Sequence, residues 1–598
     1  MNPRTRNLSL AWTNVTGSVL SILGPSAVMS QENTGALEEL IVTARKVEEP
    51  LQETPLAVTA LSGAQMRAES IVTLDDVKGI PNLSVIGGGV TQGQARLAIR
   101  GVSFTNTDPF QAPAIALSVD GVYYDSMTSA ILNVFDLESL EVLRGPQGTL
   151  FGANSPGGVI NVKSRRPSGE FDFNAEATFG NYSRSDVRLG VDIPLVDGKL
   201  NARVAVLKRD SSDSPYENLA TTPVRFAPPA IPFSLLNDRL SDELAPDRRD
   251  VLLGRVVLDF TPTEALSFTL IHESLDDEST TVPFKGTSDD TVPAGALTPP
   301  GLPGGDDPFV GVNDLSTFGP LETQVTMLTI DYDLTESLTL TSISAQRNEE
   351  RLNSWDVDGE FDPFLHSVQF WDQEQFTQEL RLHSNFDGRL NFVVGGFYMD
   401  ATLDKIQESQ LSRDALCLAI FGTANPGPPP AGGCPIGGFA PDGMGGFIGP
   451  FAAFTHNFSD VRQDTINTAL FAQLYFDLND KTRLTVGGRY TKDEKDFVVD
   501  VRFGNGAIGF DPGVSPPTPG AIEVDESNDW SNFSPMVSID YRWNDDVLLY
   551  ASYREAFRAG GYPGRANSVA SFQEAFDEEF LWPSNWASRV RWPTVASG

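Results

Sequence analysis

Alternation of apolar and polar residues is the dominant pattern of the chain from residue 170 onward. Segments of roughly ten residues alternate with a period of two, as in VLLGRVVLDF (251–260), TALFAQLYFDL (468–478) and FSPMVSIDYRW (533–543). Short turns such as TPTE, TES, NDK and NDD join some of them. The other connections are long and rich in Pro, Gly and Asp, near 212–248, 276–322, 351–366, 403–462 and 500–528.

This pattern predicts long antiparallel strands that are apolar on one face. A soluble β-sandwich or propeller is the alternative, but long strands with short turns on one side and long loops on the other favour a transmembrane β-barrel. Aromatic residues near the expected strand ends fit an interfacial girdle: Phe260, Tyr332, Phe476, Tyr490, Tyr541 and Trp543. We therefore place the long connections outside the cell.

Residues 56–166 have a different texture, which predicts a compact unit of mixed helices and strands. Strands are expected at Leu56–Leu61, Leu97–Arg100, Ala116–Val119 and Val159–Lys163. Short helices are expected at Ser62–Glu69, with Ser62 as the N-cap, and at Leu74–Ile80, before Pro81. The size suits a single domain.

The segment 134–166, VFDLESLEVLRGPQGTLFGANSPGGVINVKSRR, is dense in glycine. Such glycines indicate backbone at positive φ or in close approach to other backbone. Interleaved apolar residues such as Leu150, Phe151 and Ile160 argue against a flexible linker. The segment predicts a tightly folded, buried loop that ends in a short strand.

Four motifs, in order, resemble those of TonB-dependent outer-membrane receptors of the iron-complex or siderophore type. They are EELIVTARK (38–46), RLAIRGVS (96–103), IALSVDGVYY (115–124) and the segment 134–166. The resemblance implies an N-terminal α+β plug domain at 47–166 inside a β-barrel at 167–598, preceded by a periplasmic tail at 31–46. The family barrel has about 22 strands, of which we count about 13 here.

The resemblance also implies a function. The chain would import a scarce, large ligand across the bacterial outer membrane, gated by the plug and powered by TonB and its inner-membrane complex. A ferric siderophore is the default ligand; a saccharide, cobalamin or haem remains open. A haem ligand would be favoured by external histidines, and only His366 and His456 lie in the expected external segments.

The tail carries one apolar island that resembles the TonB box: Leu40, Ile41, Val42, Thr43 and Ala44. A strand-forming strip in a polar, exposed tail is suited to adding a strand to the sheet edge of another protein. We expect it to be exposed on the periplasmic side and to contact TonB. The alternative is that it forms the first strand of the plug, and both hold if it is docked in one state and free in another.

Two arginine–glycine pairs in the plug are candidates for holding the plug in the barrel: Arg100 with Gly101, and Arg144 with Gly145. A buried arginine needs carboxylate partners, for which we name the barrel acids Glu379 or Glu176. The alternative for each arginine is that it fixes a local turn by donating to backbone carbonyls. The plug loops 87–94 and 103–111 should face the ligand, with Gly88, Gln92, Phe104, Thr105 and Asn106 as contacts.

Composition and missing motifs exclude several function classes. The formal net charge of −37 argues against binding nucleic acid, or anionic lipid headgroups, through a basic face. We find no apolar run long enough for a transmembrane helix, so outer-membrane lipid would be met by strands. GxSxG, HExxH, P-loop and Cys/His motifs are missing, so we expect no enzyme activity, cofactor or metal site.

The N-terminus begins with Arg4 and Arg6 and continues with a moderately apolar stretch, which predicts a signal peptide at 1–30. The alternative is an unstructured tail. In an exported protein, Cys417 and Cys434 predict a disulfide within a turn-rich loop.

The C-terminal segment LWPSNWASRVRWPTVASG does not alternate and contains Trp582-Pro583 and Trp592-Pro593. About 13 strands cannot enclose a plug of about 120 residues, because barrel diameter grows with strand number. We therefore expect an open sheet with free edges near 171–180 and 546–558. The alternative to a working transporter is a truncated fragment that functions only as part of a longer parent.

Overall fold

A computed structural model describes most of the chain from Leu40 onward. The described residues are 40–47, 49–77, 79–87, 95–103, 109–126, 134–218, 246–281, 307, 309–311, 319–356, 365–412, 440–441, 447–448, 454–503, 521–564, 569–581 and 584–590.

A sheet of five strands, here called the N-terminal sheet, forms the centre of the first part of the chain. Its order is β3 (Val58–Ser62), β9 (Leu137–Arg144), β10 (Gly158–Ser164), β7 (Ile115–Val119) and β8 (Val122–Tyr124). β10 pairs parallel to β7 and antiparallel to β9. The β7–β8 hairpin turns at Asp120 and Gly121, which both have positive φ, so the Asp-Gly pair suits this two-residue turn.

Short elements surround the N-terminal sheet. They are β1 (Ile41–Val42), β2 (Glu49–Pro50), the 3-10 helix η1 (Leu51–Glu53), α1 (Gly63–Ala68), the 3-10 helix η2 (Leu74–Asp76), β4 (Leu83–Gly87), β5 (Ala95–Ile99), β6 (Val102–Ser103) and α2 (Gly148–Phe151). The Ser62 side chain accepts from the Gln65 backbone N–H, which confirms the predicted cap. The second helix, expected over Leu74–Ile80, is a single 3-10 turn, so its predicted length is wrong.

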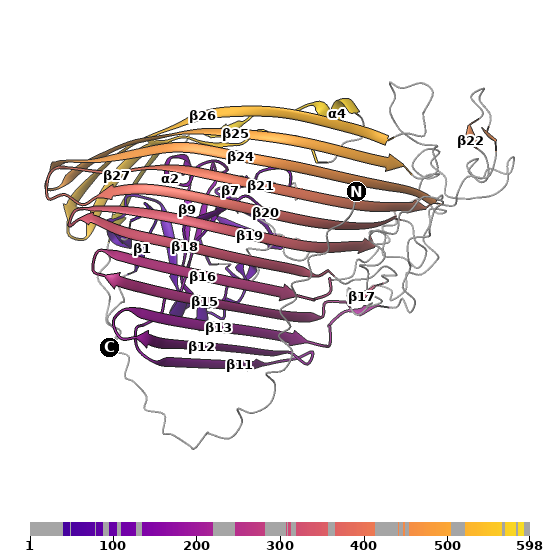
Figure 1. Ribbon diagram of the computed structural model, residues 1–598, viewed down its shortest axis with the longest axis horizontal. Coiled ribbons are helices and arrows are strands. Elements are labelled where there is room, and N and C mark those ends of the chain that lie inside the picture. Colours follow the sequence, from indigo (N-terminus) through magenta and orange to yellow (C-terminus); the bar gives the residue numbers. More distant parts are fainter. Residues whose placement is uncertain are drawn as a thin grey trace, which may run out of the picture. The chain divides into compact units, whose positions relative to one another are not determined.

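The large sheet contains fourteen strands, and their order in the sheet follows their order in the chain. Figure 1 shows most of these strands side by side. They are β11 (Asp172–Phe179), β12 (Ser185–Val196), β13 (Leu200–Ser211), β15 (Arg249–Thr263), β16 (Leu266–Asp277), β18 (Leu321–Thr335), β19 (Leu338–Asp356), β20 (Leu365–Ser384), β21 (Leu390–Ser412), β24 (Phe454–Asn479), β25 (Thr482–Phe503), β26 (Ala521–Asn544), β27 (Val547–Arg554) and β30 (Ser584–Val590). Their antiparallel pairing confirms the strand-rich fold that the alternation predicts.

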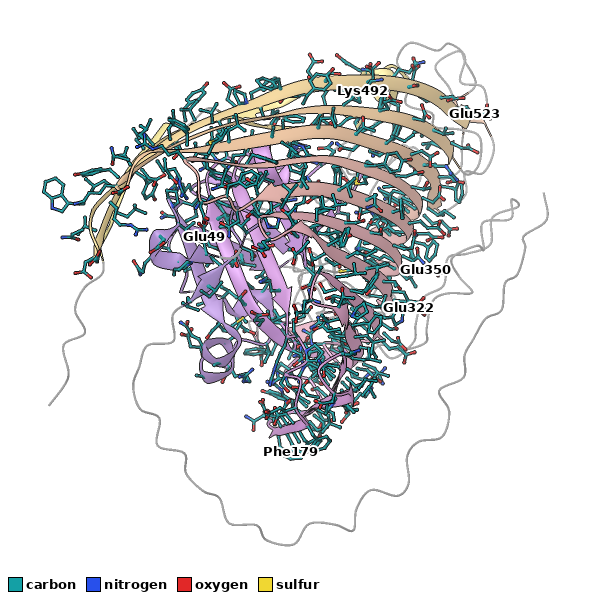
Figure 2. The ribbon with its side chains drawn as sticks, turned by 60° about the vertical axis from the view of Figure 1, so that its left-hand side comes forward. Glu49, Phe179, Glu322, Glu350, Lys492 and Glu523 are labelled. Carbon is teal, nitrogen blue, oxygen red and sulfur yellow. The ribbon has the colours of Figure 1, made fainter. Side chains whose placement is uncertain are left out.

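The two faces of the large sheet differ as the alternation requires. On β15, Val251 and Leu253 are buried, whereas the intervening Leu252 is 48% exposed. An exposed apolar face suits lipid hydrocarbon. Nearer the long connections this face becomes acidic: Glu322 and Glu350 are exposed cross-strand neighbours, labelled in Figure 2.

The buried face of the large sheet and the N-terminal sheet share one apolar core. Leu117, Val142 and Ile160 from the N-terminal sheet belong to the same cluster as Ile343 and Met327 from the large sheet. The two sheets therefore stabilise each other through burial, and separating them would expose this cluster to water.

The strand order of the large sheet begins at β11 and ends at β30. The edge near 171–180 is where we expected it. The edge expected at 546–558 is wrong, because β27 pairs with β30 in the register Val547 with Val590. Sequence reasoning missed β30 because it is short and follows Pro583, although backbone pairing at an edge does not require alternation.

The other elements are short. They are β14 (Glu217–Asn218) paired with β17 (Val310–Gly311), β22 (Ala440–Pro441) with β23 (Phe447–Ile448), β28 (Ala556–Arg558) with β29 (Glu579–Leu581), and α4 (Val569–Gln573). Of the helices in the described ranges, none has the length and apolarity needed to cross a membrane.

Candidate functional site

The segment Leu40–Pro50, here called the strap, is docked rather than free. Val42 and Ala44 are buried in a cluster with Val58, Leu143 and Val159 of the N-terminal sheet. β1 pairs with β2, placing Ile41 opposite Pro50. The expected exposure of Leu40–Ala44 therefore holds in full only for Ile41, which is 45% exposed. The structure matches the alternative in which this strip packs as the first strand of the expected plug.

Glu141 holds the strap at Thr43. Its carboxylate accepts from the Thr43 backbone N–H (2.9 Å) and from Asn161 Nδ2 (3.1 Å), and Asn161 also donates to Thr43 Oγ1 (3.0 Å). Burial raises the pKa of Glu141, and the hydrogen bond from Thr43 opposes that shift. The buried carboxylate is thus satisfied by the docked strap, and undocking would remove its backbone donor.

Two strap cations lie against the large sheet. Arg45 forms a buried ion pair with Glu49 and stands over the Tyr475 ring of β24, 5.3 Å from its centroid. Lys46 Nζ donates to Glu379 Oε2 of β20 at 2.5 Å and lies 5.7 Å from the ring centroids of both Phe151 and Phe471. Burial lowers the pKa of Lys46 to about 8, although Glu379 opposes this shift.

A cavity of about 1010 Å³ opens beside the strap, lined by Thr43, Arg45 and Lys46 together with residues of the large sheet near its short turns. Charged side chains of both signs line its wall from the large sheet and its short turns: Arg381, Arg389, Lys481, Arg483 and Arg542, with Asp331, Asp387, Asp477, Asp480 and Asp540. Because short turns mark the expected periplasmic side, the cavity is on the side where a TonB strand would arrive.

The predicted pairing of Arg100 or Arg144 with Glu379 or Glu176 is wrong. Glu379 binds Lys46 and Arg381, and Glu176 binds Arg188 on the neighbouring strand. Arg144 instead donates to Pro81 O (3.2 Å) and Thr59 Oγ1 (3.0 Å), close to the alternative of a locally bound arginine. Arg144 is the last residue of β9, and its guanidinium binds β3 and the turn before β4.

Backbone geometry explains the glycines that follow both arginines. Arg100 and Gly101 both have positive φ, as does Gly145. Burial lowers the pKa of Arg144, and the positive charge of Arg100 lowers it further. Arg100, Gly101 and Gly145 therefore shape turns within the expected plug.

Asp136 makes one such contact that sequence reasoning missed. Arg203 of β13 donates to both of its carboxylate oxygens (2.8 and 2.6 Å) and to Asp192 of β12 (2.7 Å). Arg255 of β15 donates to the carbonyl oxygens of Phe135 and Asp136. In the sequence, the one indication of this contact is the position of Asp136 directly before β9. The sequence does not indicate its partners, because they lie far along the chain.

A second missed contact joins the glycine-rich loop to the segment after β27. Asn154 accepts from Ala559 N–H and donates through its own N–H to Phe557 O, both at 2.9 Å. Arg558 Nε donates to Ala112 O (2.7 Å). These bonds tie residues 112 and 154 to residues 557–559, over 400 positions away in the chain.

The buried face near the long connections carries a polar row formed by directly opposed residues. Arg351, Trp371 and Lys405 are neighbours on β19, β20 and β21, and all three are buried. The Arg351 guanidinium stands over the Trp371 ring at 5.2 Å, and Lys405 Nζ lies 5.7 Å from the ring centroid of Phe110.

Several predicted residues lie outside the described part of the chain. These are the ligand-facing candidates Gly88, Gln92, Phe104, Thr105 and Asn106, the cysteines Cys417 and Cys434, and the signal peptide at 1–30. The side chains of His366 and His456 are likewise not described. Among the residues that are, no group of three or more His, Cys, Asp or Glu side chains could hold a metal ion.

Family models match both parts of the chain. The model described as TonB dependent receptor-like, beta-barrel, matches residues 267–580, more than half of the chain. The model described as TonB-dependent Receptor Plug Domain matches residues 50–159. The chain belongs to the TonB-dependent receptor family. The resemblance stated from the four motifs is confirmed, and the N-terminal sheet and the large sheet are those of the family's plug and barrel.

Curated relatives of this receptor match over short regions. The pesticin receptor of Yersinia pestis is 29% identical over 202 residues, covering 33% of this chain and 29% of that protein. The vitamin B12 transporter BtuB of Vibrio vulnificus is 29% identical over 150 residues, covering 24% and 23%. The ferrichrome outer membrane transporter and phage receptor of Escherichia coli is 27% identical over 152 residues, covering 25% and 19%. These alignments span less than a third of each relative.

Solved structures share the fold of this receptor. The ferric yersiniabactin uptake receptor FyuA of Yersinia pestis superposes with a TM-score of 0.67 at 17% identity, covering 90% of this chain and 70% of that chain. The siderophore receptor PiuA of Acinetobacter baumannii gives 0.61 at 17% identity, with the same coverage. The family and these neighbours are receptors and transporters, not enzymes, and they imply an outer-membrane location.

Proposed function

We propose that this receptor imports a ferric siderophore across the bacterial outer membrane and that TonB supplies the energy. In this proposal residues 47–166 form the plug and residues 167–598 contribute the barrel. The observation that carries it is the docking of the TonB-box strip. The strip is bound to the plug through Glu141 and continues directly into Lys46, which is bound to the barrel through Glu379.

A strand from TonB would pair with Leu40–Ala44 only after the strap leaves its site, because Val42 and Ala44 are buried. Exposing a valine side chain costs about 1.5–3 kcal/mol, and the lost hydrogen bond to Glu141 adds about 1–3 kcal/mol. A difference of this size can be offset by ligand binding, so docking can couple an occupied site to TonB recruitment. The pull would then act on the Lys46–Glu379 pair.

The ligand class is supported by the proteins that share the fold. They include proteins named as receptors for ferric yersiniabactin, ferric catecholates and ferric preacinetobactin. A curated relative named as a vitamin B12 transporter keeps cobalamin as the alternative to be tested beside iron complexes, with haem and saccharides.

Uptake by whole cells tests this proposal. Cells that lack other receptors for the ligands would express the full chain, with and without TonB, and be offered labelled ferric catecholate, ferric hydroxamate, haem, cyanocobalamin and a maltodextrin. We expect TonB-dependent uptake of a ferric complex and none of the others. TonB-dependent uptake of cyanocobalamin alone would replace the proposed ligand, and equal uptake without TonB would contradict the energy source.

A further inference from the structure

The barrel wall near the long connections holds a group of buried donors with no acceptor in the described part of the chain. They are Arg351 Nη1 and Nη2, Asn353 Nδ2 and Trp371 Nε1. Arg351 faces Trp371 across β19 and β20, and Asn353 faces Gln369 two residues further along. The three side chains therefore form one contiguous patch, here called the donor patch, on the same face of adjacent strands.

Burying these donors without acceptors costs free energy on folding. Buried polar groups are nearly always hydrogen-bonded, and a buried guanidinium nitrogen without an acceptor loses the hydrogen bonds that it would make to water. The Arg351 guanidinium has only Nε engaged, with Asn353 Oδ1 at 3.3 Å. By contrast, Arg347, two inward-facing positions before Arg351 on β19, forms a buried ion pair with Glu349 and also donates to Gln373.

The orientation of the patch restricts what it can bind. The face of the Trp371 ring is covered by Arg351, so the ring does not offer this face as a stacking platform. Its indole N–H and the two terminal guanidinium nitrogens remain as donors. A fork of guanidinium nitrogens matches the paired oxygens of a carboxylate or of a deprotonated catechol.

The patch also lies beside the plug. Lys405, opposite Trp371 on β21, stands over the ring of Phe110. Phe110 follows the predicted ligand-facing residues Phe104, Thr105 and Asn106 in the chain. A group bound at the donor patch would thus be close to the barrel wall and to the plug segment around Phe110. Its binding could therefore affect both the barrel and the plug.

We propose that Arg351, Asn353 and Trp371 bind an anionic, oxygen-rich group of the imported ligand and select charged chelates over uncharged ones. The proposal rests on the proposed import function and adds a ligand charge class with residues that recognise it. A neutral corrinoid or saccharide would bring no anionic acceptor to the two terminal guanidinium nitrogens, whereas a carboxylate or catecholate would.

Calorimetric binding to the purified full chain in detergent tests this selectivity. The probes are an anionic ferric tris-catecholate, an uncharged ferric trihydroxamate of similar size, and an iron-free anionic catecholate. The variants are Arg351→Gln and Trp371→Phe. Arg462→Gln is the matched control, because Arg462 lies at a similar level on β24, faces outward and binds Asp464.

We expect Arg351→Gln to weaken catecholate binding about 10- to 100-fold and Trp371→Phe about 3- to 10-fold, since each loses donors to a charged acceptor. Binding of the trihydroxamate and all binding by Arg462→Gln should stay unchanged. The melting temperature of Arg351→Gln should stay equal or rise, because the substitution removes a buried charge whose terminal nitrogens have no hydrogen-bond acceptor among the described residues. A clear drop in melting temperature would indicate a structural role and overturn the proposal.

The outcomes separate this inference from the proposed function. Ferric complexes that bind equally well to Arg351→Gln would leave iron import standing and refute the donor patch. Arg351-dependent binding of the iron-free catecholate, with no binding of any ferric complex, would support the patch and refute iron import. Binding of none of the probes would refute both.

Discussion

Lys46 Nζ lies 2.5 Å from Glu379 Oε2, and this contact joins the TonB-box segment to the barrel wall. Both side chains are nearly buried, so the pair is formed in a medium where a lone charge is costly. The strap is therefore held at two points within four residues, at Thr43 by the plug and at Lys46 by the barrel.

Replacement of Glu379 by glutamine should release this hold. It leaves the Lys46 ammonium buried without its counter-ion, which costs about 3–5 kcal/mol for a buried pair. We expect faster cleavage by protease within residues 40–50 and a lower urea midpoint in detergent. Glu176→Gln is the control, because Glu176 is exposed and pairs with Arg188 on the surface, where such a pair contributes about 0–1 kcal/mol. Equal protease sensitivity in the two variants would contradict the role of Glu379.

The charge on Lys46 also predicts a pH dependence. Burial lowers its pKa to about 8 from the ordinary 10.5, so between these values the unfolded chain holds a proton that the folded chain has lost. The free energy of unfolding should therefore rise with pH across this window, by about 3 kcal/mol from this group. Lys46→Met removes the titration. The wild type minus Lys46→Met difference should rise from pH 8 to 10.5, and a flat difference would show that Lys46 keeps an ordinary pKa.

Proline at Ile41 should abolish energised uptake without preventing ligand binding. Ile41 is the exposed member of β1, so its change spares the buried cluster around Val42, while proline removes a backbone donor that strand addition by TonB requires. Ile41→Ala keeps that donor and should transport normally. Uptake by Ile41→Pro at the rate of Ile41→Ala would exclude this strip as the TonB contact.

The alternation along β15 or β25 made the large sheet predictable, because the apolar and polar faces of a strand can be identified from that strand's own sequence. Contacts between distant segments have no such local sequence pattern. Lys46 and Glu379 are 333 positions apart, and nothing near either residue indicates the other. Arg144 looked suited to bind a barrel acid, but which of its possible partners it meets depends on how β9 packs beside β3 and Pro81, and that geometry is tertiary.

The donor patch could have been found in part from the sequence. Period-two counting places Arg351 and Asn353 on one face of their strand, and Trp371 and Gln369 on one face of the next. What the sequence does not provide is the register that sets Arg351 opposite Trp371, or the burial that leaves their donors without acceptors. Those two facts come from the sheet as a whole.

Cys417 and Cys434 remain predicted partners in a disulfide. Closing a loop of this length would stabilise the folded chain by about 3 kcal/mol through the unfolded state. Mass spectrometry of peptides from outer membranes, with and without reductant, should show a mass that falls into two peptides only after reduction. Free, alkylatable thiols on both residues without reductant would refute the bond, and Cys417→Ser should leave Cys434 alkylatable.

Asp136 should be the firmest attachment of the plug to the first barrel strands. It accepts two hydrogen bonds from Arg203, whose third contact is Asp192, and its backbone carbonyl accepts from Arg255.

Asp136→Asn keeps the shape of the side chain but removes the charge from a buried, bidentate pair. Because Asp192 still compensates Arg203, we expect a loss of about 2–3 kcal/mol in urea unfolding, below the range for a fully orphaned charge. Asp172→Asn is the matched control, since Asp172 is exposed and forms its ion pair with Arg165, at 3.3 Å, near the surface. The Asp136 variant should also loosen the plug at residues 134–137 while leaving the strap protected from protease, because the strap is held by Glu141 and Glu379. Loss of protection at both ends together would show that the plug is released as one rigid body instead of at separate anchors.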